Sequence, residues 1–72
     1  MKLRIRDLRE DRDLTQTAVA KILGCTQQTY SRYESWEITI DIYNLIKLAE
    51  FYGTSCDYLL GLTDIFKPYK KN

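Results

Sequence analysis

Residues 23–34 read Leu-Gly-Cys-Thr-Gln-Gln-Thr-Tyr-Ser-Arg-Tyr-Glu, and this stretch decides the fold. Gly24 can end one helix, and Thr26, two residues later, can cap the next. A connection as short as Gly-Cys-Thr forces the two helices to cross steeply instead of running antiparallel. The spacing is typical of a helix-turn-helix, in which the second helix of the pair is presented outward.

The apolar pattern on both sides of this turn is helical, and β-branched alternation is scarce. We expect a first helix over roughly 2–12, and four more that follow capping residues. The expected N-caps are Thr15, Thr26, Asp41 and Ser55, and the expected helix ends are Gly24, Gly53 and Gly61. The side chains expected to face the core are Ile5, Leu8, Val19, Ala20, Leu23, Tyr30, Tyr33, Ile42, Leu45, Ile46, Ala49, Tyr52, Cys56, Leu59 and Leu60. Five short helices with such brief connections predict a compact all-α domain.

The chain has 72 residues, which is enough for one domain. We place that domain at residues 1–61 and treat 62–72 as a C-terminal tail. No apolar run approaches the ~20 residues of a membrane span, and the N-terminus lacks the apolar core of a signal peptide. We therefore expect a cytoplasmic protein with no membrane partner. Cys25 and Cys56 fall at apolar positions, so we expect buried free thiols and no disulfide.

The net charge of +1 is unevenly distributed along the chain. Residues 1–12 carry +2 and residues 65–72 carry +3, whereas residues 13–64 carry −4. Because the basic groups sit at the two ends, any contact with a polyanion must be local.

The inventory of reactive side chains argues against an enzyme. Histidine is absent, so Ser-His and Cys-His nucleophile systems are excluded. The two cysteines have no companion ligands nearby, and no Gly-rich phosphate loop is present. We therefore expect no catalytic site, no metal and no cofactor. Five helices also leave no evident pocket for a small-molecule effector.

The ordered set of motifs resembles the lambda-repressor-like (Cro/CI, or XRE) helix-turn-helix family over about residues 3–61. The motifs are Leu14-Thr15-Gln16, Val19-Ala20, Leu23-Gly24-Cys25-Thr26, Ser31-Arg32-Tyr33-Glu34, Leu45-Ile46-Lys47-Leu48-Ala49, and the run from Tyr52 to Gly61. The resemblance implies a DNA-binding transcriptional regulator, usually a repressor that binds double-stranded DNA as a homodimer on a palindromic operator.

The family also implies roles for individual residues. The DNA-binding positions that it implies are Gln16, Thr26, Gln27, Gln28, Thr29, Ser31 and Arg32. Gln16 is similar to a glutamine that touches a backbone phosphate and steadies the recognition helix. Arg9 and Glu34 match positions that form an ion pair between the first and third helices in several relatives.

The chemistry of the glutamine pair favours the same reading. A glutamine amide offers one N–H and one C=O in a plane, which matches the N7 acceptor and N6 donor of adenine. Gln27, nearest the helix start, is expected to make this bidentate pair. Gln28 is rotated by about 100° toward the neighbouring base pair, where it can donate to guanine N7 or O6 or contact a thymine methyl group. Arg32, one turn later, can reach a guanine or contact a phosphate.

The chain departs from the family after the third helix. The family usually has Gly and then Lys or Arg there, whereas this chain has Trp36 and Glu37, and Ile40 replaces the usual Pro before the fourth helix. Glu37 repels phosphate, which puts the usual phosphate contact of this loop in doubt. The loop and the near-neutral charge leave an alternative: a protein-interaction module of the same fold, such as an antitoxin-like protein. Leu62, Ile65, Phe66 and Tyr69 lie beyond the usual last helix and are candidate dimer contacts; the alternative is that they cover the first helix of their own chain.

Overall fold

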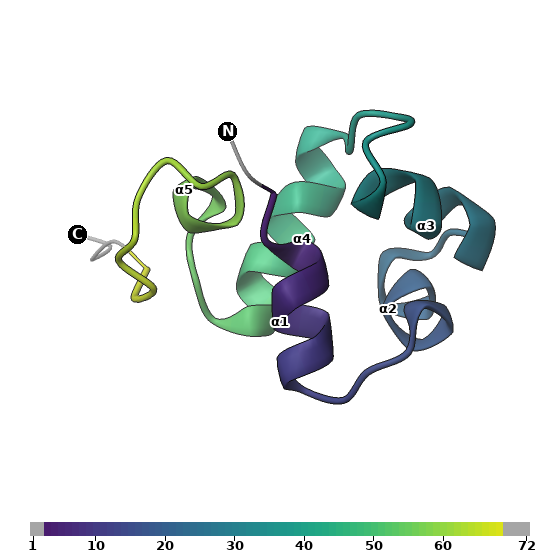
Figure 1. Cartoon of the computed structure of the whole chain (residues 1–72), viewed down its shortest axis with the longest axis horizontal. Helices are drawn as coiled ribbons and strands as arrows, with labels where there is room; N and C mark the ends of the chain where they lie inside the picture. The colour runs from purple at the N-terminus through teal and green to yellow at the C-terminus, as the bar shows by residue number, and fades with distance from the viewer. Residues whose placement is uncertain (1–2, 69–72) are drawn as a thin grey trace.

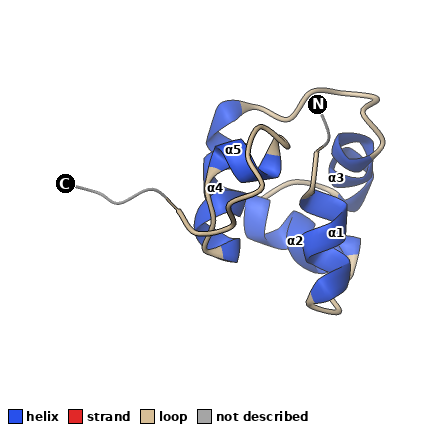
Figure 2. Cartoon of the chain, turned by 60° about the vertical axis from the view of Figure 1, so that its left-hand side comes forward, coloured by secondary structure: helices blue, strands red, loops and turns tan. Residues whose placement is uncertain are grey.

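The computed structural model describes residues 3–68 and contains five helices (Figure 1). They are α1 (Ile5–Asp11), α2 (Gln16–Leu23), α3 (Gln27–Glu34), α4 (Ile42–Tyr52) and α5 (Cys56–Leu59). No strand is present in this part of the chain, so the predicted all-α class is confirmed (Figure 2). The first helix was predicted over 2–12 and spans Ile5–Asp11 in the structure. Residues 1 and 2 lie outside the described range. None of the five helices is long and apolar enough to cross a membrane.

The predicted capping side chains close the N-termini of α2 to α5. Each accepts a hydrogen bond from a backbone N–H three residues on: Thr15 from Ala18, Thr26 from Thr29, Asp41 from Asn44 and Ser55 from Tyr58. Such a bond satisfies one of the N–H groups that a helix start leaves without a partner. Gly24 and Gly53 follow α2 and α4 with left-handed φ angles of 70° and 71°, which glycine reaches without steric cost. α5 ends at Leu59, two residues before Gly61.

The core lies between the helices and contains most of the residues that the periodicity assigned to it. The largest fully buried side chains are Tyr30, Tyr52, Ile5, Leu48, Leu59 and Val19. Cys25 and Cys56 are free thiols that are only half-buried at the edge of this core. Burial raises the pKa of both thiols, which keeps them protonated at neutral pH.

The prediction for α4 was wrong at two positions. Ile42 and Ile46 were expected to face the core, but their side chains are 65% and 42% exposed. The buried stripe is instead Leu45, Leu48, Ala49 and Tyr52. At about 100° per residue, including Leu48 turns the centre of this stripe away from Ile46, which then lies at its edge.

The segment after α5 packs back onto the helices. The Arg4 guanidinium, at the start of α1, donates to the Asp64 carboxylate at 2.7 Å and lies 4.3 Å from the centre of the Tyr58 ring. The Phe66 ring stacks edge-on against Tyr58 at 5.2 Å, and the Phe66 carbonyl accepts a hydrogen bond from the Thr54 hydroxyl. This segment therefore covers part of α5, whereas Leu62 and Ile65 remain mostly exposed. Tyr69 lies outside the described residues.

Candidate nucleic-acid interface

α3 has one buried face and one outward face. Tyr30 and Tyr33 are buried in the core, and α3 packs against α2 across the turn at residues 24–26 (Figure 1). Its first turn and its last turn carry exposed polar side chains on the opposite side, while two further positions are half-buried. The exposed ones are Gln27, Gln28 and Arg32, and the half-buried ones are Thr29 and Ser31. The outward face is therefore polar and carries a single positive charge.

The hydroxyl groups at the start of α3 serve mainly to shape the helix. Thr26 Oγ1 accepts a hydrogen bond from the Thr29 backbone N–H at 3.1 Å, and it donates to Thr29 Oγ1 at 3.0 Å. Thr26 therefore closes the helix whether or not it also meets a ligand. The first-turn backbone N–H groups and the helix dipole make this end favourable for an anion.

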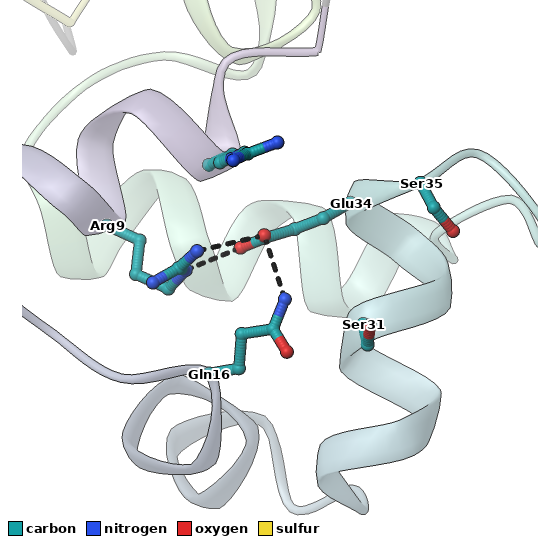
Figure 3. A pocket seen from close by; sticks show the side chains of 6 residues that line it. Arg9, Gln16, Ser31, Glu34 and Ser35 are labelled. Carbon is teal, nitrogen blue, oxygen red and sulfur yellow. Dashed lines mark hydrogen bonds and ion pairs between the residues drawn. The ribbon is translucent and has the colours of Figure 1, made fainter.

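A chain of hydrogen bonds ties the first turn of α3 to its last turn through α2. The Gln27 amide donates from Nε2 to Gln16 Oε1 at 2.6 Å. Gln16 Nε2 in turn donates to Glu34 Oε1 at 3.1 Å, the bond that Figure 3 shows. An amide NH₂ group has two N–H bonds. Gln27 therefore keeps one N–H and its carbonyl oxygen for a further partner, and Gln16 keeps one N–H.

Arg9 and Glu34 join α1 to α3 at the end of this series of hydrogen bonds. Arg9 Nε lies 2.7 Å from Glu34 Oε2, and Nη2 lies 3.2 Å from Oε1, which makes the contact bidentate (Figure 3). Arg9 also donates to the Leu14 carbonyl at 2.9 Å. The two side chains are only 13% and 5% exposed. The ion pair expected from the family resemblance is thus present, and it is largely buried.

The electrostatic state of Glu34 follows from these bonds. Burial alone raises the pKa of Glu34, but hydrogen bonds from Arg9 and Gln16 outweigh it and hold the pKa below its ordinary value. Glu34 is therefore ionised at neutral pH and accepts from both neighbours. The carboxylate acts as the fixed point from which Gln16, and through it Gln27, is oriented.

The chain after α3 turns back over the end of the helix. The Glu37 N–H donates to the Arg32 carbonyl at 3.0 Å and the Trp36 N–H donates to the Tyr33 carbonyl at 3.3 Å. This pair of bonds is the Schellman motif, which requires a left-handed residue just after the helix. Trp36 supplies it with a φ of 66°, although glycine is the residue that usually does so.

The turn places a carboxylate beside the only cation on the outward face of α3. Glu37 Oε2 lies 3.6 Å from Arg32 Nε, and the two side chains are 66% and 56% exposed. A shallow hollow of about 320 Å³ lies over this region. Its lining consists of Gln27, Gln28, Ser31, Arg32 and Glu37.

The structure brings together most of the side chains that the sequence singled out. Gln27, Gln28, Ser31 and Arg32 share the hollow, and Gln16 reaches Gln27 from α2. Sequence reasoning treated Glu37 only as a charge that repels phosphate and missed its pairing with Arg32. The usual signal for a helix end that folds back in this way is a glycine, and Trp36 stands in its place.

No group of three or more potential metal-ligating side chains is found in the described range. The hollow over α3 and a second one of about 280 Å³ beside the Arg9–Glu34 pair are both open to solvent. Neither has the enclosed apolar lining that small-molecule sites usually have.

Comparison with known proteins agrees with this geometry. A family model described as helix-turn-helix matches residues 5–59. The chain is 38% identical over 61 residues to the uncharacterized HTH-type transcriptional regulator YobD of Bacillus subtilis, covering 85% of this chain and 54% of that protein. It is 44% identical over 50 residues to the cryptic phage CTXphi transcriptional repressor RstR of Vibrio cholerae, covering 69% and 45%. The HTH-type transcriptional regulator AnsR of Bacillus subtilis is 34% identical over 58 residues, covering 81% and 50%.

The chain spans about half the length of the curated relatives that it matches. No solved structure matches it significantly. The family model covers most of the chain, including all five helices of the described residues. The chain belongs to the Cro/CI-type (XRE) helix-turn-helix family.

Proposed function

We propose that the chain is a sequence-specific DNA-binding transcriptional regulator, acting as a repressor, that reads the major groove of double-stranded DNA with α3. The observation that carries the proposal is the hydrogen-bonded chain Gln27–Gln16–Glu34–Arg9, which orients an outward amide at the helix start. The names of the relatives, which include transcriptional regulators and a repressor, support it. We expect such a protein to act in the cytoplasm.

Base reading is assigned to the first turn of α3. Gln27 keeps a carbonyl oxygen and one N–H after bonding Gln16, and this is the donor–acceptor pair that adenine matches with N6 and N7. Gln28, about 100° around the helix, meets the next base pair, where it donates to guanine N7 or O6 or contacts a thymine methyl group. Arg32, one turn later, reaches a guanine or, as the alternative, a phosphate.

Phosphate contact is assigned to the residues around this turn. Gln16 has one N–H left after bonding Glu34, and a phosphate oxygen is a suitable acceptor for it. Thr26, Thr29 and Ser31 flank the same surface with hydroxyl groups. Such contacts fix the position of a protein on the duplex without selecting a sequence.

The active form is proposed to be a two-fold dimer on a palindromic operator. One module reads only a few base pairs, which gives too little specificity among many competing sites. Leu62 and Ile65 are 63% and 66% exposed just beyond α5, and apolar side chains in this position can be covered by a second copy. Two recognition helices in such a dimer lie about 34 Å apart, one turn of the duplex.

The alternative is a protein-interaction module that keeps the fold without binding DNA. It is favoured by the exposed apolar side chains after α3, since Trp36 is 50% exposed, Ile42 65% and Tyr43 80%. The Gln27 amide, which Gln16 orients, argues against it, because its remaining donor and acceptor match the edge of adenine.

The deciding experiment is a titration of the protein with duplexes selected from a random pool, followed at two salt concentrations. DNA binding through phosphate contacts gives an affinity that falls steeply as salt rises. We expect selected duplexes to share an adenine at a fixed position in each half-site. If no duplex is enriched and no salt-dependent binding is detected, the DNA-binding proposal is wrong and the interaction module takes its place.

A further inference from the structure

The pairing of Arg32 with Glu37 is unusual in its position. Arg32 is the only cation on the outward face of α3, and a carboxylate 3.6 Å from its Nε partly neutralises it. Both side chains line the hollow that Gln27 and Gln28 also line. The family pattern quoted above has a basic residue where this chain has Glu37, so the reversal of charge lies within the proposed DNA interface itself.

We propose that Glu37 is a specificity-determining positioning residue, which restrains Arg32 so that non-specific DNA is bound weakly relative to the operator. The inference rests on the proposed function, because it concerns how the same surface meets DNA. Its physical basis is that non-specific binding comes almost entirely from contacts of cations with phosphate. A guanidinium that must leave a carboxylate to reach a phosphate gains less from that contact.

The geometry of the pair leaves the base-reading option open. The nearest approach, Nε to Glu37 Oε2 at 3.6 Å, is longer than a hydrogen bond, so the N–H groups of Arg32 remain for the O6 and N7 acceptors of guanine. Arg32 in this orientation can bind guanine without breaking the pair with Glu37. A phosphate contact, by contrast, brings the Glu37 carboxylate close to another anion. The pair therefore opposes phosphate contact on any sequence more than it opposes guanine contact on the operator.

The backbone holds Glu37 in place independently of its side chain. Its N–H bonds the Arg32 carbonyl at 3.0 Å, and the Ile38 N–H approaches the same carbonyl at 3.4 Å. Replacing the carboxylate with an amide therefore leaves the turn intact. The carboxylate is 66% exposed and is not part of the core, so the protein is expected to stay folded, which a thermal melt checks.

The test compares Glu37→Gln with the wild-type chain on a selected duplex and on a scrambled duplex. We expect Glu37→Gln to bind the scrambled duplex about threefold to tenfold more tightly, from one cation released to meet phosphate. The plot of log affinity against log salt should steepen by about 1. Affinity for the selected duplex should rise less, so that the ratio between the two duplexes falls.

Three further variants make the result specific. Glu37→Asp keeps the charge and should retain the weak binding to the scrambled duplex. Glu50→Gln makes the same change of net charge at an exposed position in the last turns of α4, and should leave the ratio unchanged. In an Arg32→Gln background, Glu37→Gln should lose most of its effect, because the effect acts through Arg32.

Two kinds of failure are distinguishable. If the wild-type chain binds no duplex, the proposed function fails and this inference fails with it. If the wild-type chain binds a selected duplex, the inference alone is overturned by any of three results. These are an unchanged ratio and salt slope for Glu37→Gln, an equal effect for Glu50→Gln, and a full effect of Glu37→Gln in the Arg32→Gln background.

Discussion

Gln27 is the residue on which the proposed base reading depends. Its amide is held by Gln16 and still offers a donor and an acceptor. We expect Gln27→Ala to cost about 1–3 kcal/mol of binding free energy and to relax the preference at one base position. Ser31→Ala is the control, because Ser31 does not hold Gln27 and loss of a phosphate contact should weaken binding to every sequence nearly alike. The measurement is fluorescence anisotropy on a selected duplex and its single-base variants. Equal losses on all variants for Gln27→Ala contradict the assignment.

Trp36 has a strained backbone conformation, and its side chain is half-exposed. Its φ of 66° is a conformation that L-residues adopt at a cost of about 1–2 kcal/mol. Trp36→Gly and Trp36→Ala lose the same half-exposed indole, but only glycine relieves the backbone. We therefore expect the glycine variant to have a higher free energy of unfolding than the alanine variant, by about 1 kcal/mol.

The control for Trp36 is an exposed position inside a helix. At Lys47, in the middle of α4, the order should reverse, since glycine is about 1 kcal/mol less favourable than alanine in a helix interior. Denaturant unfolding of the four variants measures both differences. If Trp36→Gly is no more stable than Trp36→Ala, the left-handed conformation at Trp36 is not a source of strain.

Tyr52 buries a hydroxyl group that has no hydrogen-bond partner among the described residues. Leaving a buried polar group unpaired costs about 1–3 kcal/mol, so Tyr52→Phe should raise the free energy of unfolding at neutral pH. Burial raises the pKa of Tyr52 to about 12. Between pH 10 and 12 the unfolded chain loses this proton while the folded chain keeps it, so stability falls as pH rises through that window.

Measuring unfolding free energy at pH 7 and across this alkaline window tests both statements. Tyr52→Phe should lose less stability than the wild-type chain between pH 10 and 12. Tyr43→Phe removes a hydroxyl from a side chain that is 80% exposed. It should change neither the unfolding free energy at pH 7 nor the loss of stability between pH 10 and 12. A Tyr52→Phe variant that is clearly less stable at pH 7 reveals a partner for the hydroxyl and contradicts the prediction.

At the scale of elements, the Arg9–Glu34 pair links α1 to α3. Removing one partner leaves the other charge buried, which costs about 3–5 kcal/mol when a pair is shielded from water. We expect Arg9→Met and Glu34→Gln each to lower the free energy of unfolding strongly. The double mutant should lose much less than the sum, because it leaves no unpaired charge. Thermal and denaturant unfolding of the wild-type chain, the two single mutants and the double mutant give a double-mutant cycle. If the losses of unfolding free energy are strictly additive, the two side chains are not coupled.

The pH dependence of the pair has a definite sign. Because the folded-state pKa of Glu34 lies below its ordinary value, the unfolded chain binds this proton first as pH falls. The ionised Glu34 carboxylate therefore contributes stability above the ordinary glutamate pKa, and this contribution is lost as pH falls through the pKa of Glu34 in the folded state. Glu34→Gln should therefore reduce the loss of unfolding free energy that the wild-type chain shows as pH falls.

The control for the double-mutant cycle is the exposed Arg6–Glu10 pair on α1, whose atoms approach to 3.6 Å. Its coupling energy is expected to be below about 0.5 kcal/mol.

The helices show which features the sequence could predict. Four N-caps and the ends of α2 and α4 were predictable because a hydroxyl, carboxylate or glycine acts locally, within three or four residues. The exposure of Ile42 and Ile46 was missed because the predicted stripe left out Leu48, whose inclusion turns the centre of the buried face away from Ile46. The turn after α3 was missed for a different reason: its usual glycine is replaced by Trp36, so the contact of Glu37 with Arg32 had no local signal.

The site was predictable as a set of residues and less so as a network. The helix-turn-helix spacing identifies the outward face of α3, and the family resemblance supplied the Arg9–Glu34 pair. The hydrogen bonds of Gln16 to both Gln27 and Glu34 join residues that are 11 and 18 positions apart. Such contacts are visible only in the three-dimensional arrangement. The family resemblance implied that Gln16 steadies the recognition helix, but it did not identify Gln27 and Glu34 as the partners of Gln16.

At the scale of the whole molecule, the proposed dimer needs a surface on which two copies meet. The segment after α5 covers part of α5 with Phe66, but it leaves Leu62 and Ile65 exposed. A stable interface buries about 800 Å² from each partner and has an apolar centre. We expect Leu62 and Ile65, three positions apart and both mostly exposed, to lie at such a centre in the proposed dimer.

We therefore expect Leu62→Glu combined with Ile65→Glu to convert a dimer into a monomer at micromolar concentration. The same variant should lose affinity for a palindromic duplex but keep its affinity for a single half-site, because α3 is untouched. Tyr43→Glu, which places the same charge on the exposed side of α4, is the matched control and should remain dimeric. Sedimentation equilibrium with and without the duplex gives the mass of each species. A wild-type chain that stays monomeric even on the palindrome rejects the dimer, and dissociation by Tyr43→Glu alone moves the interface to α4.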